Sequence, residues 1–158
     1  MIEAGRHTPT AAPTSSPWAV AALVWSAIFA AVHLYWAAGG RGGLGGSSDE
    51  ADVALATGWF QLYNLVTAVL ALAGAALAAL LLRPGVSQRA TRWIARLAAV
   101  AAVVLLLRGV LGVVMLVIET LGDGPSEPRP MLLLLVEPWF VLGGIVFGGV
   151  WRVAGGRR

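Results

Sequence analysis

Three ionisable and two amide side chains lie within the apolar runs of this sequence and are its candidates for chemistry. They are His33, Gln61, Asn64, Arg108 and Glu137. A carboxylate can act as a general base, an imidazole can titrate near neutral pH, and a guanidinium can stabilise an anion. These residues fall in four separate apolar runs, so only the fold can bring them together.

The apolar runs indicate membrane spans. Hydrophobic residues make up 58% of the 158 residues and charged residues only 12%, against roughly 25% charged residues in soluble domains. A soluble chain of this length could not bury so much apolar surface. The runs are long enough to cross the bilayer, because about 20 helical residues span a hydrocarbon core of about 30 Å.

The expected fold class is therefore all-α, an integral membrane four-helix bundle with both termini in the cytoplasm. One domain over residues 17–153 holds the four helices, and residues 1–16 and 154–158 are expected to be cytoplasmic tails, the first of them disordered. The helices are predicted over about residues 17–38, 58–82, 92–120 and 131–153. The glycine-rich residues 39–46 are expected to be a flexible hinge.

Arginines beside the helix ends predict the orientation, since cytoplasmic loops of membrane proteins carry an excess of basic residues. Arg41 and Arg129 fall on one side. The opposite side holds Arg6, Arg83, Arg89, Arg92, Arg96, Arg152, Arg157 and Arg158. We expect the richer side to face the cytoplasm of a cell membrane and to contact anionic lipids. All eleven basic residues are Arg, which, with abundant Ala and Gly, indicates a GC-rich bacterial genome.

Position along the helices puts the polar residues at similar depths. Measured from the predicted outer boundary at about 1.5 Å per residue, His33 lies roughly 8 Å deep, Asn64 and Glu137 about 9 Å, and Arg108 about 16 Å. Arginine can reach several ångströms towards the surface. We therefore predict one polar cluster in the outer half of the bilayer. Its candidate members are His33, Trp36, Gln61, Asn64, Arg108, Glu137 and Trp139.

Helical phase predicts that the cluster faces other helices, because residues 4, 7 and 11 apart share a helix face. Small residues let helices approach closely in a membrane, and one polar residue of each helix shares its face with some of them. Glu137 is in phase with Gly144 and Gly148, and Arg108 is in phase with Gly112. The remaining stripes join His33 with Ser26 and Ala22, and Asn64 with Ala68, Ala71 and Ala75.

Each candidate has a structural and a functional interpretation. Arg108 and Glu137 form either an ion pair that fixes helix register or the charged wall of an outward-facing pocket. His33 either makes a structural hydrogen bond or relays a proton. Gln61 and Asn64 either hold helices together or contact a ligand.

Several classes of site are excluded or unsupported. The absence of cysteine excludes disulfides, thiolate metal sites and iron–sulfur clusters. A single buried His is too few ligands for a metal or haem site, so no cofactor is expected. Residues 39–46 lack the Lys and Ser/Thr of a phosphate loop. The arginines sit at the ends of apolar runs rather than along one stripe, which is not typical of nucleic-acid binding.

Two local strings resemble the signatures of a known bacterial family. They are His33-Leu34-Tyr35-Trp36-Ala37-Ala38-Gly39-Gly40 and Glu137-Pro138-Trp139-Phe140-Val141-Leu142-Gly143-Gly144. The chain resembles, over nearly its whole length, the family catalogued as domain of unknown function 3995. That resemblance implies a small four-helix membrane protein and implies no activity.

Three functions are compatible with this sequence. The first is small-ligand binding or a transport-associated role at the outward-facing cluster, and a homo-oligomer would enclose more volume than four short helices. The second is a membrane enzyme acting on a lipid-soluble substrate, although the sequence favours a non-enzymatic protein. The third is a structural or assembly subunit with a packed polar core. A ligand-sized cavity lined by His33, Asn64, Arg108 and Glu137 would favour binding.

Overall fold

The computed structural model describes residues 16–44, 48–122 and 131–156. Within these ranges the chain is helical and contains no strand. The helices are α1 (Pro17–Ala37), α2 (Ser48–Ala56), α3 (Gly58–Leu81), α4 (Gln88–Leu121) and α5 (Met131–Gly155). The predicted disordered tail lies outside the described residues, apart from Ser16.

Four of the helices are long and apolar enough to cross a membrane. The candidate spans are Pro17–Ala37, Gly58–Leu81, Gln88–Ile118 and Leu135–Gly155. Long side chains on their outer surfaces are exposed, such as Leu111 of α4 at 63%. Continuous exposed apolar surface of this kind suits contact with lipid rather than water. The protein is therefore a multi-pass membrane protein built as an all-α four-helix bundle.

Local sequence signals explain the helix boundaries. Pro17 occupies the start of α1, where a missing N–H costs nothing. The turn after α3 contains Gly85 at φ 81°, a left-handed conformation that glycine adopts without strain. Ser87 then caps α4, because its hydroxyl accepts a hydrogen bond from the Ala90 N–H at 3.2 Å. This cap makes α4 begin at Gln88, earlier than the predicted start near residue 92.

Two other boundaries differ from the sequence analysis. The nine-residue helix α2 lies between the first two predicted membrane helices, where the sequence predicts no helix, and it packs against α3. Helix α2 is too short and too polar to resemble a membrane span, so no apolar run in the sequence indicates it. At the other end, α5 continues to Gly155, into residues that were expected to form a tail.

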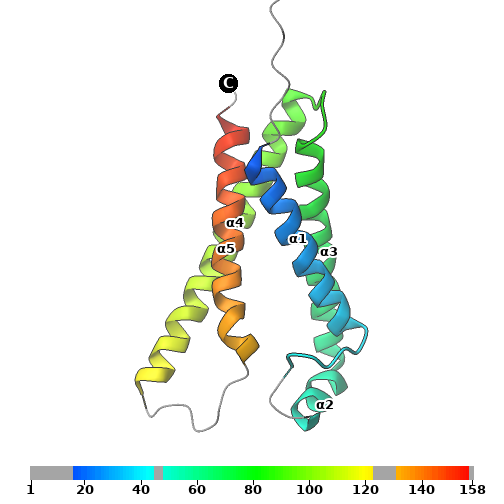
Figure 1. The fold of residues 1–158 in the computed structure, drawn as a ribbon, viewed down its shortest axis with the longest axis vertical. Helices are drawn as coiled ribbons and strands as arrows, with labels where there is room; N and C mark the ends of the chain where they lie inside the picture. Colours follow the sequence, from blue (N-terminus) through cyan, green and yellow to red (C-terminus); the bar gives the residue numbers. More distant parts are fainter. Residues whose placement is uncertain (1–15, 45–47, 123–130, 157–158) are drawn as a thin grey trace, which may run out of the picture.

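The four long helices form two pairs (Figure 1). Helix α1 packs along α3, α4 packs along α5, and the main contact between the pairs runs from α1 to α5. The pairs lie close together near the start of α1 and the end of α5, and they diverge towards α2. The result is a wedge-shaped bundle that is wider at the α2 end.

Small residues form the packed faces within each pair. The buried face of α3 consists of Asn64, Ala68, Ala71, Ala75 and Ala78. On α1 the buried residues include Ala22, Ser26 and His33. These are the stripes that helical phase predicts, and they let the two backbones approach closely.

Glycines mark the crossing of α4 and α5. A Cβ added at Gly109 would lie 2.7 Å from the backbone nitrogen of Val141, and one at Gly144 would lie 2.5 Å from Cγ of Leu106. The predicted close approach at Gly144 is therefore present. At Gly148 the same prediction is wrong, because an added Cβ there has no atom within 4 Å.

The start of α1, the α3–α4 turn and the end of α5 share one end of the molecule. The described arginines that were assigned to one membrane side lie on the segments at that end: Arg83, Arg89, Arg92, Arg96 and Arg152. Arg41, assigned to the other side, lies near α2 and pairs with Asp52 at 2.6 Å. The two groups of arginines are thus separated as the sequence indicates, and their orientation in the membrane stays a prediction.

Candidate functional site

Arg108 of α4 and Glu137 of α5 form an ion pair between the two helices. The Arg108 Nη1 group donates a hydrogen bond to Glu137 Oε2. The Glu137 side chain is 15% exposed and that of Arg108 is 47% exposed. Gly112, one turn after Arg108, makes room for the carboxylate, since a Cβ there would overlap it. The predicted pairing between these helices is therefore present.

Arg108 has a second contact, with an aromatic ring. Its Cζ atom lies 4.9 Å from the centroid of the Phe140 ring on α5. A guanidinium this close to a ring face is attracted by the ring quadrupole. Glu137 and Phe140 together hold the guanidinium against α5, and its remaining N–H groups are left for other acceptors.

His33 is buried among aromatic rings on α1. It is 5% exposed, and its Nδ1 lies 2.9 Å from the carbonyl oxygen of Phe29. A carbonyl oxygen only accepts hydrogen bonds, so Nδ1 carries the proton and donates it, which leaves Nε2 as an acceptor in the neutral ring. The ring centroids of Phe29, Trp36 and Tyr63 lie 4.2, 5.4 and 6.4 Å from that of His33.

The two amide side chains of α3 have different environments. Asn64 is 1% exposed, and its Nδ2 donates to the Phe60 carbonyl at 2.8 Å. Gln61 is exposed, and its Nε2 lies 3.4 Å from the carbonyl oxygen of Leu55 in α2. Asn64 thus faces the interior of the bundle, whereas Gln61 links α3 to α2.

A cavity of about 480 Å³ lies between the two helix pairs near α2, and we call it the α2-end cavity. Polar side chains of three helices line it, and aromatic and aliphatic side chains form the rest of its wall. The candidate residues on this wall are His33, Trp36, Asn64, Arg108 and Trp139. Glu137 and Gln61 are not part of the wall. The structure therefore brings five of the seven candidates to one cavity. Glu137 lies outside the cavity wall and is paired with Arg108.

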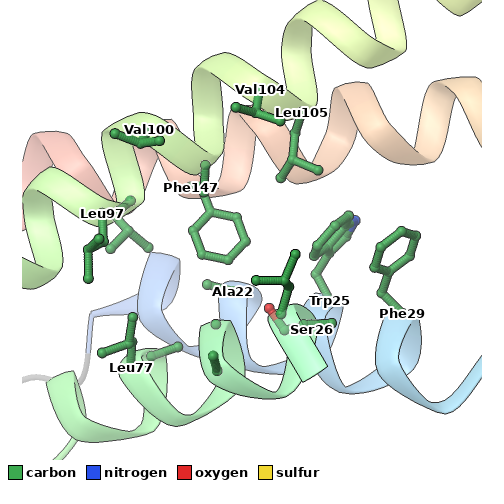
Figure 2. A pocket seen from close by; sticks show the side chains of 18 of the residues that line it. Ala22, Trp25, Ser26, Phe29, Leu77, Leu97, Val100, Val104, Leu105 and Phe147 are labelled. Carbon is green, nitrogen blue, oxygen red and sulfur yellow. The ribbon is translucent and has the colours of Figure 1, made fainter. Parts of the chain in front are cut away.

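A second cavity, of about 640 Å³, lies between the helix pairs along their middle, and we call it the apolar cavity (Figure 2). Its wall includes Trp25, Ser26, Leu77, Val104 and Phe147. Residues shared by the walls of both cavities are Phe29, Tyr63, Arg108 and Phe140. The two cavities are therefore neighbours, and they meet at Arg108.

No pattern in the sequence indicates the apolar cavity. Trp25 and Phe147 are apolar residues in apolar runs, so no local pattern distinguishes them from lipid-facing side chains. Ser26 was noted only as a small residue on the His33 face. Its polarity within a membrane span was the one signal that could have drawn attention to this region.

The wall of the α2-end cavity offers hydrogen-bonding groups among aromatic rings. Arg108 supplies donors and the His33 Nε2 supplies an acceptor. The described ranges hold no group of three or more His, Cys, Asp or Glu residues that could bind a metal ion. The chemistry on the wall is thus that of recognition through hydrogen bonds and ring contacts.

The family model described as "Protein of unknown function (DUF3995)" matches residues 25–147 of the 158-residue chain. The chain belongs to this family. The match runs from Trp25 to Phe147, so it covers all seven candidate residues and both strings that resemble the family signatures. The comparisons with curated proteins and with solved structures gave no match. Membership of the DUF3995 family assigns no activity.

Proposed function

We propose that this protein binds a small, uncharged amphiphilic molecule in the α2-end cavity. The observation that carries the proposal is the cavity of about 480 Å³ whose wall combines Arg108, His33 and Asn64 with several aromatic rings. Ligand sites are typically concave and mostly apolar, with a few polar groups that orient the ligand, and their volumes are about 300–1,000 Å³. A transport-associated role would use the same site.

The charges around the cavity favour an uncharged ligand. Glu137 neutralises Arg108, and an anion placed beside the guanidinium would be repelled by that carboxylate. A ligand oxygen from a hydroxyl, ether or carbonyl group can instead accept from an N–H group of Arg108 without adding charge. Rings of Trp36, Tyr63 and Trp139 provide flat apolar surface for the remainder of the molecule.

The two other functions have less support. A structural subunit with a packed polar core would leave no cavity at the cluster, and here three buried or half-buried polar groups line one. For a lipid-modifying enzyme, Glu137 was a candidate general base, but it pairs with Arg108 and does not reach the cavity wall. His33 would then have to act alone, through Nε2.

Thermal denaturation of the purified full chain in nanodiscs tests this proposal. We expect monooleoylglycerol, which is uncharged and rich in hydroxyl groups, to raise the melting temperature more than oleate does. Asn64→Leu should weaken the effect, with an affinity loss of about two- to tenfold for one hydrogen bond.

The matched control is Gln61→Leu, which removes the same kind of side chain one turn earlier on α3, outside the cavity wall. It should leave the response to monooleoylglycerol unchanged. Equal responses of the wild type to oleate and monooleoylglycerol, or equal losses in both variants, would contradict the proposal.

A further inference from the structure

We infer that the apolar cavity is a separate binding site for a hydrocarbon chain that carries a hydroxyl or keto group away from its ends, recognised by Ser26. This site adjoins the α2-end cavity, but Ser26 belongs to its wall alone, and the inference does not rest on the function proposed for the α2-end cavity. It rests on the burial of Ser26, on the wall of the cavity and on its opening towards the lipid.

Ser26 is a fully buried polar residue whose hydroxyl has no partner. It is 0% exposed, and its Oγ atom makes no hydrogen bond with any residue that the structure describes. A buried hydroxyl left unpaired is costly, so native structures usually satisfy it. An unpaired hydroxyl within a membrane span indicates a position that a ligand oxygen can complete.

Other hydroxyl groups in the helices make a backbone hydrogen bond that Ser26 does not make. A Ser or Thr in a helix commonly bonds to the carbonyl four residues earlier. Thr67 does so with Tyr63 at 2.8 Å, and Thr120 does so with Leu116 at 2.7 Å. Ser26 makes no such bond to its own helix, so its hydroxyl keeps its hydrogen-bonding capacity. Because the hydroxyl is fully buried, a ligand oxygen reaches it when a side chain of the cavity wall, such as Phe147, moves aside.

The hydroxyl lies beside the apolar cavity, between α1 and α3. A Cβ added at Gly74 of α3 would lie 3.2 Å from the Ser26 Oγ and 3.3 Å from Cζ of Phe147 on α5. Figure 2 shows the Ser26 hydroxyl among the side chains that line the cavity, with Phe147 above it. Gly74 thus lets α3 and the Phe147 ring pack closely around the hydroxyl.

A water molecule is a poor occupant of this space. A buried water needs about two to four polar partners, and the cavity wall around Ser26 is aliphatic and aromatic. The polar group of Arg108 belongs to the end of the cavity that adjoins the α2-end cavity. The wall around Ser26 is apolar and has one hydroxyl. A hydrocarbon chain that carries one oxygen therefore suits it better than water does.

The cavity opens towards the lipid between α3 and α4. Residues on its wall are also exposed at the molecular surface: Leu70 of α3 at 68%, and Val100 and Val104 of α4 at 62% and 58%. The two pairs are joined mainly through α1 and α5, so the opposite side is left for entry from the bilayer.

The depth of Ser26 in the membrane restricts where along its chain a ligand must carry the oxygen. It lies 9 residues after Pro17 and 11 before Ala37, roughly 13 to 17 Å from either end of the span at about 1.5 Å per residue. An oxygen bound there is near the middle of the membrane. The ester carbonyls of bilayer phospholipids lie at the interface, so they do not supply it, whereas a chain substituted along its length does.

Competition photolabelling of the full chain in nanodiscs tests the inference. The probe is a hexadecane bearing a diazirine, and the competitors are unlabelled hexadecan-8-ol, hexadecan-8-one and hexadecane. We expect the probe to label α1, α3 and α4 residues of the cavity wall. The two oxygen-bearing competitors should displace it at concentrations about three- to tenfold lower than hexadecane, as one hydrogen bond predicts.

Variants assign this preference to Ser26. In Ser26→Ala the probe should still label the cavity, and the three competitors should displace it at equal concentrations. Thr67→Val removes another hydroxyl from the same wall, one already bonded to Tyr63, and should keep the preference. Ala101→Phe fills the cavity and should abolish labelling there.

Three outcomes would overturn the inference. The first is a preference for oxygen that survives in Ser26→Ala. The second is labelling spread evenly over the lipid-facing surface of the helices. The third is a Ser26→Ala protein that no longer folds, because the hydroxyl would then have a structural partner. Loss of monooleoylglycerol binding through Asn64→Leu leaves each of these results unaffected, so the two proposals can fail separately.

Discussion

Trp25 of α1 donates its indole N–H to the backbone carbonyl of Trp139 in α5, with 3.1 Å between nitrogen and oxygen. The two indole rings are stacked, with centroids 6.0 Å apart. Trp25 also packs on Gly143 of α5, where a Cβ would overlap its ring. Because α1 and α5 provide the main contact between the helix pairs, Trp25 contributes a hydrogen bond and ring packing to the interface that joins them.

Trp25→Phe should therefore destabilise the whole bundle. The change removes the hydrogen bond and part of the ring packing on Gly143, for an expected loss of about 1–3 kcal/mol. Chemical denaturation in detergent, followed by circular dichroism, measures it. Trp59→Phe is the control, since Trp59 is 71% exposed and should tolerate the change. Similar losses in both variants would show that Trp25 does not join the pairs.

The ion pair between Arg108 and Glu137 makes a second prediction. Removing one partner leaves an uncompensated charge, which typically costs about 3–5 kcal/mol in buried pairs. Arg108→Leu and Glu137→Leu should each lower stability more than the double variant does. A double-mutant cycle on unfolding free energies measures the coupling. Strictly additive losses would mean that the two side chains do not interact.

The crossing of α4 and α5 predicts different responses from two glycines. Gly109→Ala brings a Cβ within 2.7 Å of a backbone nitrogen, so the helices must move apart, at a cost of about 1–3 kcal/mol. Gly148→Ala meets no atom within 4 Å and should be neutral or gain up to about 1 kcal/mol from helix propensity. Melting temperatures in detergent compare them. A Gly109→Ala protein as stable as Gly148→Ala would mean that α4 and α5 do not approach closely at Gly109.

The orientation can be tested with single cysteines, because the chain has none of its own. Val53→Cys on α2 and Ser87→Cys at the α3–α4 turn occupy exposed positions at opposite ends of the bundle. We expect an impermeant thiol reagent to label the cysteine at position 53 in intact cells and to spare position 87 until the membrane is permeabilised. The reverse pattern would overturn the predicted orientation.

The architecture could be predicted because membrane spans leave a strong sequence signal. Apolar runs of about 20 residues give the four helices, and the Ala and Gly stripes give the faces that pack within each pair. The Arg108–Glu137 contact followed from depth, since two costly charges at similar depth stabilise one another. These inferences depend on local composition and helical phase alone.

The cavities could not be predicted, since they depend on how the two pairs lie relative to each other. Depth and phase predict that Glu137 joins the cluster, and Gln61 is included as a polar residue near Asn64 on the same run. The Glu137 carboxylate instead lies against Gly112, and the Gln61 amide lies against α2. Trp25 and Ser26 lie on the buried face of α1, and only the divergence of the pairs gives that face a cavity. The sequence contains no local feature that reports this divergence.

The pairing of α1 with α3 and of α4 with α5 has a consequence for assembly. Each pair joins consecutive membrane spans, so each is a helical hairpin that can form before the other half of the chain is inserted. The turn at Gly85 then only connects two preformed halves, and the packing of α1 on α5, including Trp25, joins them. Fragments 1–85 and 86–158 produced together should therefore reassemble into one complex without a covalent link, and the same fragments carrying Trp25→Phe should separate more readily.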